Sequence, residues 1–233
     1  DGEQIHVIHL NDLVFGSELE ASDEVQYYRR NQVAHYVVLR CLQKPSHVVI
    51  FVNLHLSYPP PEHSLRVKQM AYILNVVLAE KRNLARKQVS QISLVGCGDF
   101  NTLPETETFR YLFDGECVYA ASANDASLKG NEKAKEQLQF VVQGDEKLKF
   151  VNPFGRKLQS VYRHSTSLPA YTNKTEDFEG CLDYIFYTNM VQDAADDDKI
   201  KSVAYKVIEG NGKFYPNETW PSDHCAVYAR FRC

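Results

Sequence analysis

The chain has 233 residues, of which 44% are hydrophobic and 24% are charged. This composition fits one globular domain over residues 1–233 and excludes a disordered or collagen-like protein. The formal net charge of −4 provides no global positive field for nucleic acid, so contact with a polyanion has to be local or assisted by a metal ion.

The apolar residues and the cysteines indicate where in the cell the protein is found. No apolar run reaches the roughly eighteen residues of a membrane-spanning helix, so we expect no membrane partner. The first residues have no basic start with an apolar stretch behind it, and we expect no signal peptide there. The six cysteines have no C-x-x-C spacing, which favours mostly buried thiols in a reducing, intracellular compartment. We expect the cytoplasm, with the mitochondrion as the alternative.

The first predicted elements are a strand, a helix and a second strand. Residues 48–56 form a β-branched and apolar run that predicts a buried strand. After a Pro-rich break, Ser64 is placed to cap a helix whose apolar residues recur at three- and four-residue spacing up to Leu78. A second strand is predicted over residues 92–95, and Pro104 with the acids after it predicts the start of another helix.

The second half of the chain predicts three further strands, over residues 182–187, 202–208 and 225–231. Before them, residues 120–159 are polar and rich in charge, which predicts a surface insertion that is irregular and partly helical. Strands interleaved with amphipathic helices indicate a layered α/β fold.

Four short segments place polar residues at the ends of predicted strands. They are Asn53-Leu54-His55-Leu56, Gly98-Asp99-Phe100-Asn101, Leu182-Asp183-Tyr184-Ile185-Phe186 and Ser222-Asp223-His224. Polar groups that gather where strands end commonly build an open α/β site. Each segment also has a structural interpretation: a hydrogen-bonded histidine at 55, a turn at 99–101, and a cap or turn at 223–224. Asp183 is different, because a carboxylate inside an apolar strand needs an Arg or His partner.

Taken together, these residues are sufficient for phosphodiester hydrolysis. Asp99, Asn101 and Asp223 supply the oxygen ligands that a hard cation such as Mg²⁺ prefers. A carboxylate can orient or deprotonate the attacking water, and His224 held by Asp183 can donate to a phosphoryl oxygen. Arg66, just beyond the His55 strand, can clamp a phosphate with two hydrogen bonds.

In this order the four segments resemble the endonuclease/exonuclease/phosphatase superfamily, although Leu54 stands where the usual N-T-H-L motif has Thr. Within it, the chain is similar to the branch of the carbon-catabolite-repression-type deadenylases, nocturnin, Angel proteins and 2′,5′-phosphodiesterase. The stretches that carry this similarity are residues 55–60, 66–70, 96–104, 169–173, 178–186 and 221–224. The resemblance implies a two-layer β-sandwich flanked by helices, of the deoxyribonuclease I kind, with the site at one edge.

The resemblance also implies roles for single residues. Asp99 and Asn101 orient the nucleophile and the phosphate beside a metal ion, His55 stabilises the transition state, and Asp183 stands behind His224. The implied metal ligands are Asp99, Asn101, Asp223 and His224.

On the substrate side, the resemblance implies that Asn173 contacts phosphate or ribose. Pro60 and Phe178 match positions that sandwich the terminal base, which suits a single-stranded end. For Phe178 the alternative is a loop aromatic that caps the core. Asn53, on the same strand face as His55, joins these substrate-binding residues.

The chain departs from the family upstream of the first segment. The family's principal metal ligand is a Glu in an L-Q-E motif, with an Asn earlier still, and neither motif is found; Glu18, Glu20 and Glu24 stand in no such motif. Residues 6–15 resemble the stretch that follows the missing part. We therefore expect an N-terminally incomplete catalytic domain with an incomplete first metal site. The missing region is also where a larger complex would form.

Three hypotheses follow. The leading one is a phosphodiesterase that uses Mg²⁺, or alternatively Mn²⁺, and acts on single-stranded RNA or oligoadenylate. It would remove adenylates as a 3′-5′ exoribonuclease or cleave 2′,5′-oligoadenylate, with at least one limb of its pH–rate profile near neutrality. The second is a non-catalytic RNA-binding or scaffold protein that retains the fold. The third is a superfamily member that acts on DNA, inositol phosphate or another phosphoester.

Overall fold

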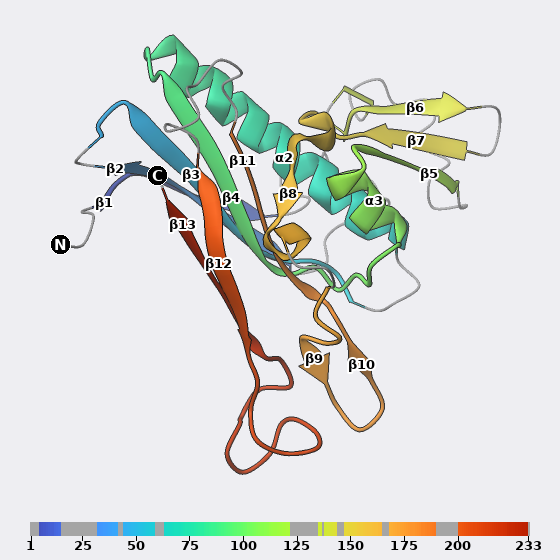
Figure 1. Cartoon of the computed structure of the whole chain (residues 1–233). Helices are drawn as coiled ribbons and strands as arrows, with labels where there is room; N and C mark the ends of the chain where they lie inside the picture. Colours follow the sequence, from blue (N-terminus) through green and yellow to red (C-terminus); the bar gives the residue numbers. More distant parts are fainter. Residues whose placement is uncertain are drawn as a thin grey trace.

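The computed structural model describes residues 5–14, 32–41, 44–58, 63–121, 135–136, 138–143, 147–164, 168–189 and 200–232. Its centre is a six-stranded sheet with the order β1-β2-β3-β4-β11-β8 (Figure 1). These strands are β1 (Ile5–Val14), β2 (Val33–Cys41), β3 (His47–His55), β4 (Gln91–Asp99), β11 (Asp183–Asn189) and β8 (Gln159–Ser160). The pair β3–β4 is parallel and every other pair is antiparallel, so the sheet is mixed.

Helix α2 (His63–Arg86) provides the crossover that the parallel pair β3–β4 requires. The predicted alternation along β3 is confirmed, because Leu54 is buried while Asn53 and His55 on either side of it are exposed. The helix begins at His63, so Ser64 lies inside its first turn. The prediction that Ser64 caps this helix is therefore wrong.

The face of the sheet away from α2 is covered by an antiparallel ribbon of β12 (Lys201–Ile208) and β13 (Ala226–Arg232) (Figure 1). Tyr205 of the ribbon meets Tyr162 of the short segment η3 (Val161–His164), and Phe231 meets Tyr187 of β11, each pair with ring centroids 5.3 Å apart. The described residues thus contain one large sheet, a helix on one face and a two-stranded second layer on the other. This is part of the expected two-layer sandwich.

Residues 120–159 were predicted to be irregular and partly helical; residues 135–136 and 138 are helical, but the described part also contains regular strands. The described part holds β6 (Phe140–Gln143), β7 (Lys147–Val151) and the short η2 (Gly155–Lys157), and β5 (Glu116–Ala120) joins a sheet of order β5-β7-β6. Phe140, Leu148 and Phe150 are buried, and the rings of the first and last are stacked. The charged residues around them obscured an alternation that turns one face to the core. That this segment varies within the family stays a prediction.

The cysteine prediction is confirmed where the structure describes these side chains. Cys117, Cys181 and Cys225 are buried, Cys97 is half-buried, and all four are free thiols. The compartment itself stays a prediction. Among the described helices, none has the length and apolar character needed to cross a membrane.

Gly98, the residue before Asp99, lies so close to the backbone of β3 that no other residue fits at this position. Its φ is +142°, and a Cβ there would lie 1.8 Å from the carbonyl oxygen of Leu54. Gly98→Ala is expected to lower the free energy of unfolding by about 3 kcal/mol or more, because β3 cannot move aside without disturbing its pairing with β4. Gly155→Ala is the control: φ is +56° but no atom lies within 4 Å of the new Cβ, so we expect about 1 kcal/mol. Urea unfolding measures both, and equal losses would contradict this packing.

Candidate active site

Three strands bring their chemistry-bearing residues into one row at one edge of the large sheet. His55 ends β3 and Asp99 ends β4, and the parallel register pairs these two residues. Asp183 begins β11 and pairs with Asp99 from the other side. Asp99 is therefore the last residue of a strand, and the predicted turn at 99–101 follows directly from it. The sheet register alone places His55, Asp99 and Asp183 side by side.

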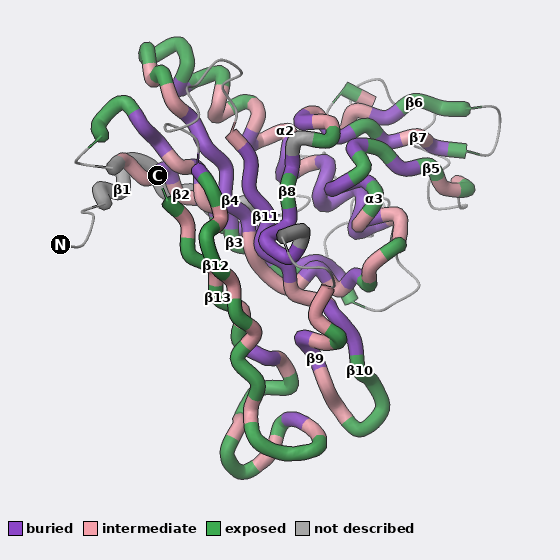
Figure 2. The backbone as a smooth tube through the Cα atoms, in the orientation of Figure 1, coloured by how far each residue is buried: buried purple, intermediate pink, exposed green. Residues whose placement is uncertain are grey.

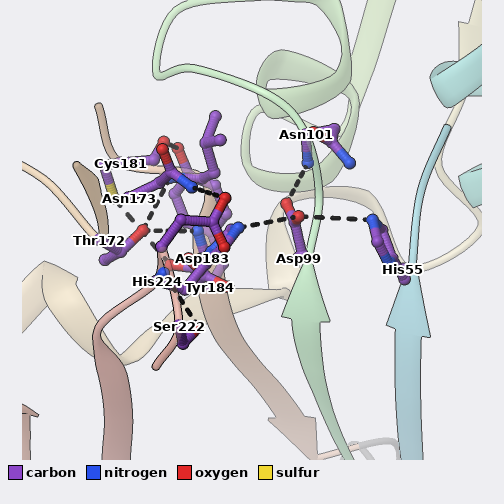
Figure 3. Close-up of polar contacts among 12 residues, drawn as sticks. His55, Asp99, Asn101, Thr172, Asn173, Cys181, Asp183, Tyr184, Ser222 and His224 are labelled. Atoms are coloured by element: carbon purple, nitrogen blue, oxygen red, sulfur yellow. Dashed lines mark hydrogen bonds and ion pairs between the residues drawn. The ribbon is translucent and has the colours of Figure 1, made fainter. Parts of the chain in front are cut away.

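The Asp99 carboxylate lies between two histidines (Figure 3). Its Oδ2 is 3.5 Å from Nε2 of His55 and 3.6 Å from Nε2 of His224. On its other side the His224 ring is held by Asp183, with 2.8 Å between Nδ1 and Oδ2. The two distances exceed the usual hydrogen-bond length, so a water molecule can donate to the Asp99 carboxylate there.

Asn101 fixes the orientation of Asp99. Its backbone N–H donates to Asp99 Oδ1 over 2.7 Å, and its side-chain Nδ2 donates to the carbonyl of Leu56 over 2.9 Å. The residue has φ +46°, a conformation that Asn tolerates better than most residues. One oxygen of Asp99 is thus occupied by this local turn, while the other faces the histidines.

The charges at this edge shift two pKa values. Burial raises the pKa of Asp99, as does the nearby Asp183 carboxylate, while the Asn101 N–H and the two histidines oppose the rise. The hydrogen bond that His224 donates to Asp183 raises the pKa of His224 from 6.5 to about 9, against the opposing effect of burial. At neutral pH His224 is therefore an imidazolium, with Nδ1–H donating to Asp183 and Nε2–H available. For this histidine the expected titration near neutrality is displaced to alkaline pH.

Two residues that support the site were not assigned by sequence reasoning. The hydroxyl oxygen of Thr172 accepts hydrogen bonds from the backbone N–H groups of Leu182 and Asp183, each over 2.9 Å. The indole Nε1–H of Trp220 donates to the carbonyl of His224 over 2.8 Å. Thr172 lies within the 169–173 stretch that carried the family resemblance, which was the only available signal. Trp220 gave none.

Thr172→Val is expected to destabilise the chain and to displace Asp183. The substitution preserves shape but removes the acceptor of two backbone N–H groups at a fully buried position, which costs about 2–3 kcal/mol. For a domain of this size that lowers the melting temperature by about 2–4 °C per kcal/mol. Thr172→Ser is the matched control, since it keeps the hydroxyl. A Val variant as stable as the Ser variant would show that this oxygen has no such function.

The substrate-side residues lie on a hairpin beside the cluster, formed by β9 (Asn173–Lys174) and β10 (Glu179–Gly180). Asn173 is buried, and its Nδ2 donates to Asp223 Oδ2 over 3.2 Å. Phe178 at the hairpin's turn is 38% exposed, and its ring lies against Gly180. Asn53 is exposed on β3, and it lies on the same face of the strand as His55, as predicted. Pro60 lies outside the described residues.

The structure does not bring Arg66 to the cluster. Its side chain is 1% exposed, and Nη1 donates to the carbonyl of Ser57 over 3.1 Å. Helix α2 turns the guanidinium inward to the backbone that follows β3, and the role of Arg66 as a phosphate clamp stays a prediction. The neighbouring Gln69 accepts from the Ser57 N–H through Oε1, so both side chains fix this segment.

The predicted metal ligands are brought together only in part. Among the described residues, no three His, Cys, Asp or Glu side chains are grouped so as to hold a metal ion. Asp223 accepts from Asn173, and the Nδ1 of His224 is engaged with Asp183. Asp99 and Asn101 nevertheless fit Mg²⁺, which is usually held by one or two carboxylates together with substrate phosphate and water. A cation there would also stabilise the ionised form of Asp99, whose pKa is raised by burial and by the nearby Asp183.

Sequence relatives fit this arrangement, although no family model matches the chain. It is 27% identical over 195 residues to the CCR4-Not complex 3′-5′-exoribonuclease subunit Ccr4 of Debaryomyces hansenii, covering 79% of this chain and 20% of that protein. It is 26% identical over 217 residues to carbon catabolite repressor protein 4 homolog 4 of Arabidopsis thaliana, covering 91% and 44%. For 2′,5′-phosphodiesterase 12 of Bos taurus the identity is 27% over 209 residues, covering 90% and 30%. The chain thus spans less than half the length of these relatives.

Solved structures show the same fold. ANGEL2, described as a 2′,3′-cyclic phosphatase and solved with adenosine-2′,3′-vanadate, superposes with a TM-score of 0.64 at 20% identity over 98% of this chain and 68% of that one. The human nocturnin catalytic domain with bound sulfate gives 0.51 at 18% identity over 97% and 60%. Motif order, sequence relatives and fold agree. The chain is therefore a distant relative of the Ccr4-type exoribonucleases and of 2′,5′-phosphodiesterase 12, and it shares the fold of ANGEL2 and nocturnin, in agreement with its resemblance to the endonuclease/exonuclease/phosphatase superfamily.

Proposed function

We propose that the chain belongs to a magnesium-dependent phosphodiesterase that acts on RNA 3′ ends, removing adenylates or cleaving 2′,5′-oligoadenylate. The observation that carries the proposal is the Asp99 carboxylate placed between His55 and a His224 that Asp183 holds. The names of two sequence relatives, a 3′-5′-exoribonuclease and a 2′,5′-phosphodiesterase, support the substrate class.

Asp99, His224 and His55 each have a separate role in the proposed hydrolysis. Asp99 Oδ2 accepts a hydrogen bond from the attacking water and orients it, or takes its proton, while Asn101 keeps the carboxylate in place. His224 donates from Nε2 to a phosphoryl oxygen as negative charge develops, and Asp183 stabilises the imidazolium that does so. His55, 63% exposed, reaches the phosphate from the solvent side. Mg²⁺ bound at Asp99 and Asn101 would neutralise phosphate charge.

The terminal nucleotide is placed by the hairpin. Phe178 offers an exposed ring at the turn of this hairpin, and stacking on an aromatic ring can hold a single-stranded end whatever its base. Asn173 is the proposed contact for phosphate or ribose, and Pro60 the second side of the base sandwich.

The test is hydrolysis of labelled oligoadenylate with 3′,5′ or 2′,5′ linkages. We expect release of AMP in Mg²⁺, loss of release with a chelator, and loss in Asp99→Ala. No turnover of either linkage, or equal turnover by Asp99→Ala, would overturn the proposal.

A second candidate function is RNA binding without cleavage. It is favoured by the absence, among the residues that the structure describes, of a three-ligand metal group. Calorimetric titration separates the two candidates. Tight binding of oligoadenylate that does not depend on Mg²⁺, without cleavage, would favour the binding protein. Binding that strengthens with Mg²⁺ and leads to AMP release would favour the enzyme.

A further inference from the structure

The outer face of the β12–β13 ribbon gathers positive charge. In the antiparallel register Lys201 lies opposite Arg232, Lys206 opposite Tyr228, and Arg230 opposite Ala204. These positions are exposed, whereas the residues between them, such as Tyr205 and Phe231, are partly buried against the large sheet. Figure 2 shows the exposed stretches alternating with intermediate ones along the ribbon. We call Lys201, Lys206, Tyr228, Arg230 and Arg232 the basic face.

The basic face is not explained by the stability of the fold. Neither strand of the ribbon contains an acidic residue, and the chain as a whole has a net charge of −4. Lys201 and Arg232 stand directly opposite each other, and like charges in that position are destabilising. Positive charge that is concentrated on one face of an acidic chain, at a cost in stability, indicates an anionic partner.

The basic face is continuous with the candidate active site. Strand β13 begins at Ala226, two residues after His224, so the ribbon starts at the cluster and leads away from it. The eight residues of β12 span roughly 25 Å at about 3.3 Å per residue. Tyr228, 52% exposed, adds an aromatic surface between the cations.

We propose that the basic face binds the phosphate backbone of single-stranded RNA, upstream of the 3′ end that the active site holds. This inference rests on the proposed function for the direction of the strand. Cations along a groove or ridge with an aromatic side chain among them are the usual means of holding a single strand without reading its sequence. An acidic protein segment would be drawn by the cations alone, but it would gain nothing from the aromatic ring or from the continuity with the cluster.

The test compares two triple variants that remove the same charge. Lys206→Gln with Arg230→Gln and Arg232→Gln acts on the basic face, while Arg82→Gln with Arg86→Gln and Lys87→Gln acts on exposed cations at the end of α2. Fluorescence anisotropy measures the binding of oligoadenylates of about four and about twenty nucleotides, in an Asp99→Asn background that prevents cleavage.

We expect the basic-face variant to bind the long RNA about tenfold to a hundredfold more weakly. The slope of log K against log salt concentration should become shallower by about 2, because three phosphate contacts are lost. The control variant should bind as the parent does, and the short RNA should bind both alike. Equal weakening in the two variants, or none in the first, would overturn the inference. So would binding of polyglutamate to the basic face as tightly as RNA, which would assign it to an acidic protein.

Hydrolysis separates this inference from the proposed function. If the unsubstituted chain cleaves the short RNA but long-RNA binding ignores the basic face, only the inference fails. If nothing is cleaved while the long RNA still depends on the basic face, the proposed function fails and the inference stands.

Discussion

Asp99→Asn is expected to lower kcat for oligoadenylate by about a thousandfold or more, and in a metal-free buffer to raise the melting temperature. Activity falls because Asp99 is the acceptor between His55 and His224, and an amide cannot take a proton or bind a cation as well. Stability rises because the neutral amide removes a buried charge whose pKa is raised by burial and by Asp183. Initial rates and thermal unfolding in a chelator measure the two effects.

Asp114→Asn is the control for this substitution. Asp114 is an exposed carboxylate at the C-terminal end of α3 (Glu107–Phe113), away from the row of site residues. We expect little change in either rate or melting temperature. An Asp99→Asn variant that keeps its rate would remove this residue from the chemistry, and one that unfolds at a lower temperature would contradict the electrostatic argument.

Asp183→Asn is expected to bring the pKa of His224 down from about 9 toward its ordinary value of 6.5, and to lower kcat about a hundredfold or more. The carboxylate holds the imidazolium through the 2.8 Å hydrogen bond, which the amide replaces with a weaker one. In the unsubstituted chain the rate should fall on the alkaline side near pH 9, and this limb should move to lower pH in the variant. NMR titration of the His224 ring and a pH–rate profile measure the shift.

The same shift makes a prediction for stability. Because the folded pKa of His224 is raised, the stability from its ion pair with Asp183 is fully present below the unfolded pKa near 6.5. It is lost as the pH rises through about 9. The free energy of unfolding of the unsubstituted chain should therefore decline over this range relative to Asp183→Asn. A difference between the two that stays constant with pH would contradict the assignment.

Much of the site could be predicted from the sequence, because its residues lie at the ends of strands with clear patterns. The alternation around Leu54 predicted that Asn53 and His55 share one face of β3. The apolar run that leads into Asp99 predicted that a strand ends there. The need of Asp183 for a partner pointed to a His or Arg, and the structure supplies His224. What these patterns could not give is the exact register that aligns His55, Asp99 and Asp183.

Other features depend on tertiary contacts that no local pattern encodes. Arg66 follows the His55 strand closely in sequence, but the helix rotates it toward the Ser57 carbonyl. Thr172 acts through two backbone N–H groups ten and eleven residues away, and its side chain carries no charge that would single it out. The buried face of β6 and β7 was hidden because the two strands are short and Lys147 and Lys149 alternate with the buried Leu148 and Phe150.

The most direct test of the central claim, that Asp99 and Asp183 act as one catalytic unit with the histidines between and beside them, is a double-mutant cycle. Asp99→Asn, Asp183→Asn and the combined variant are compared with the unsubstituted chain by kcat/KM on a short oligoadenylate in Mg²⁺. Residues that act as a unit are strongly non-additive, so the double variant should be little worse than the more damaged single variant. Losses that multiply in full would contradict the claim, because they would mean that the two carboxylates contribute independently.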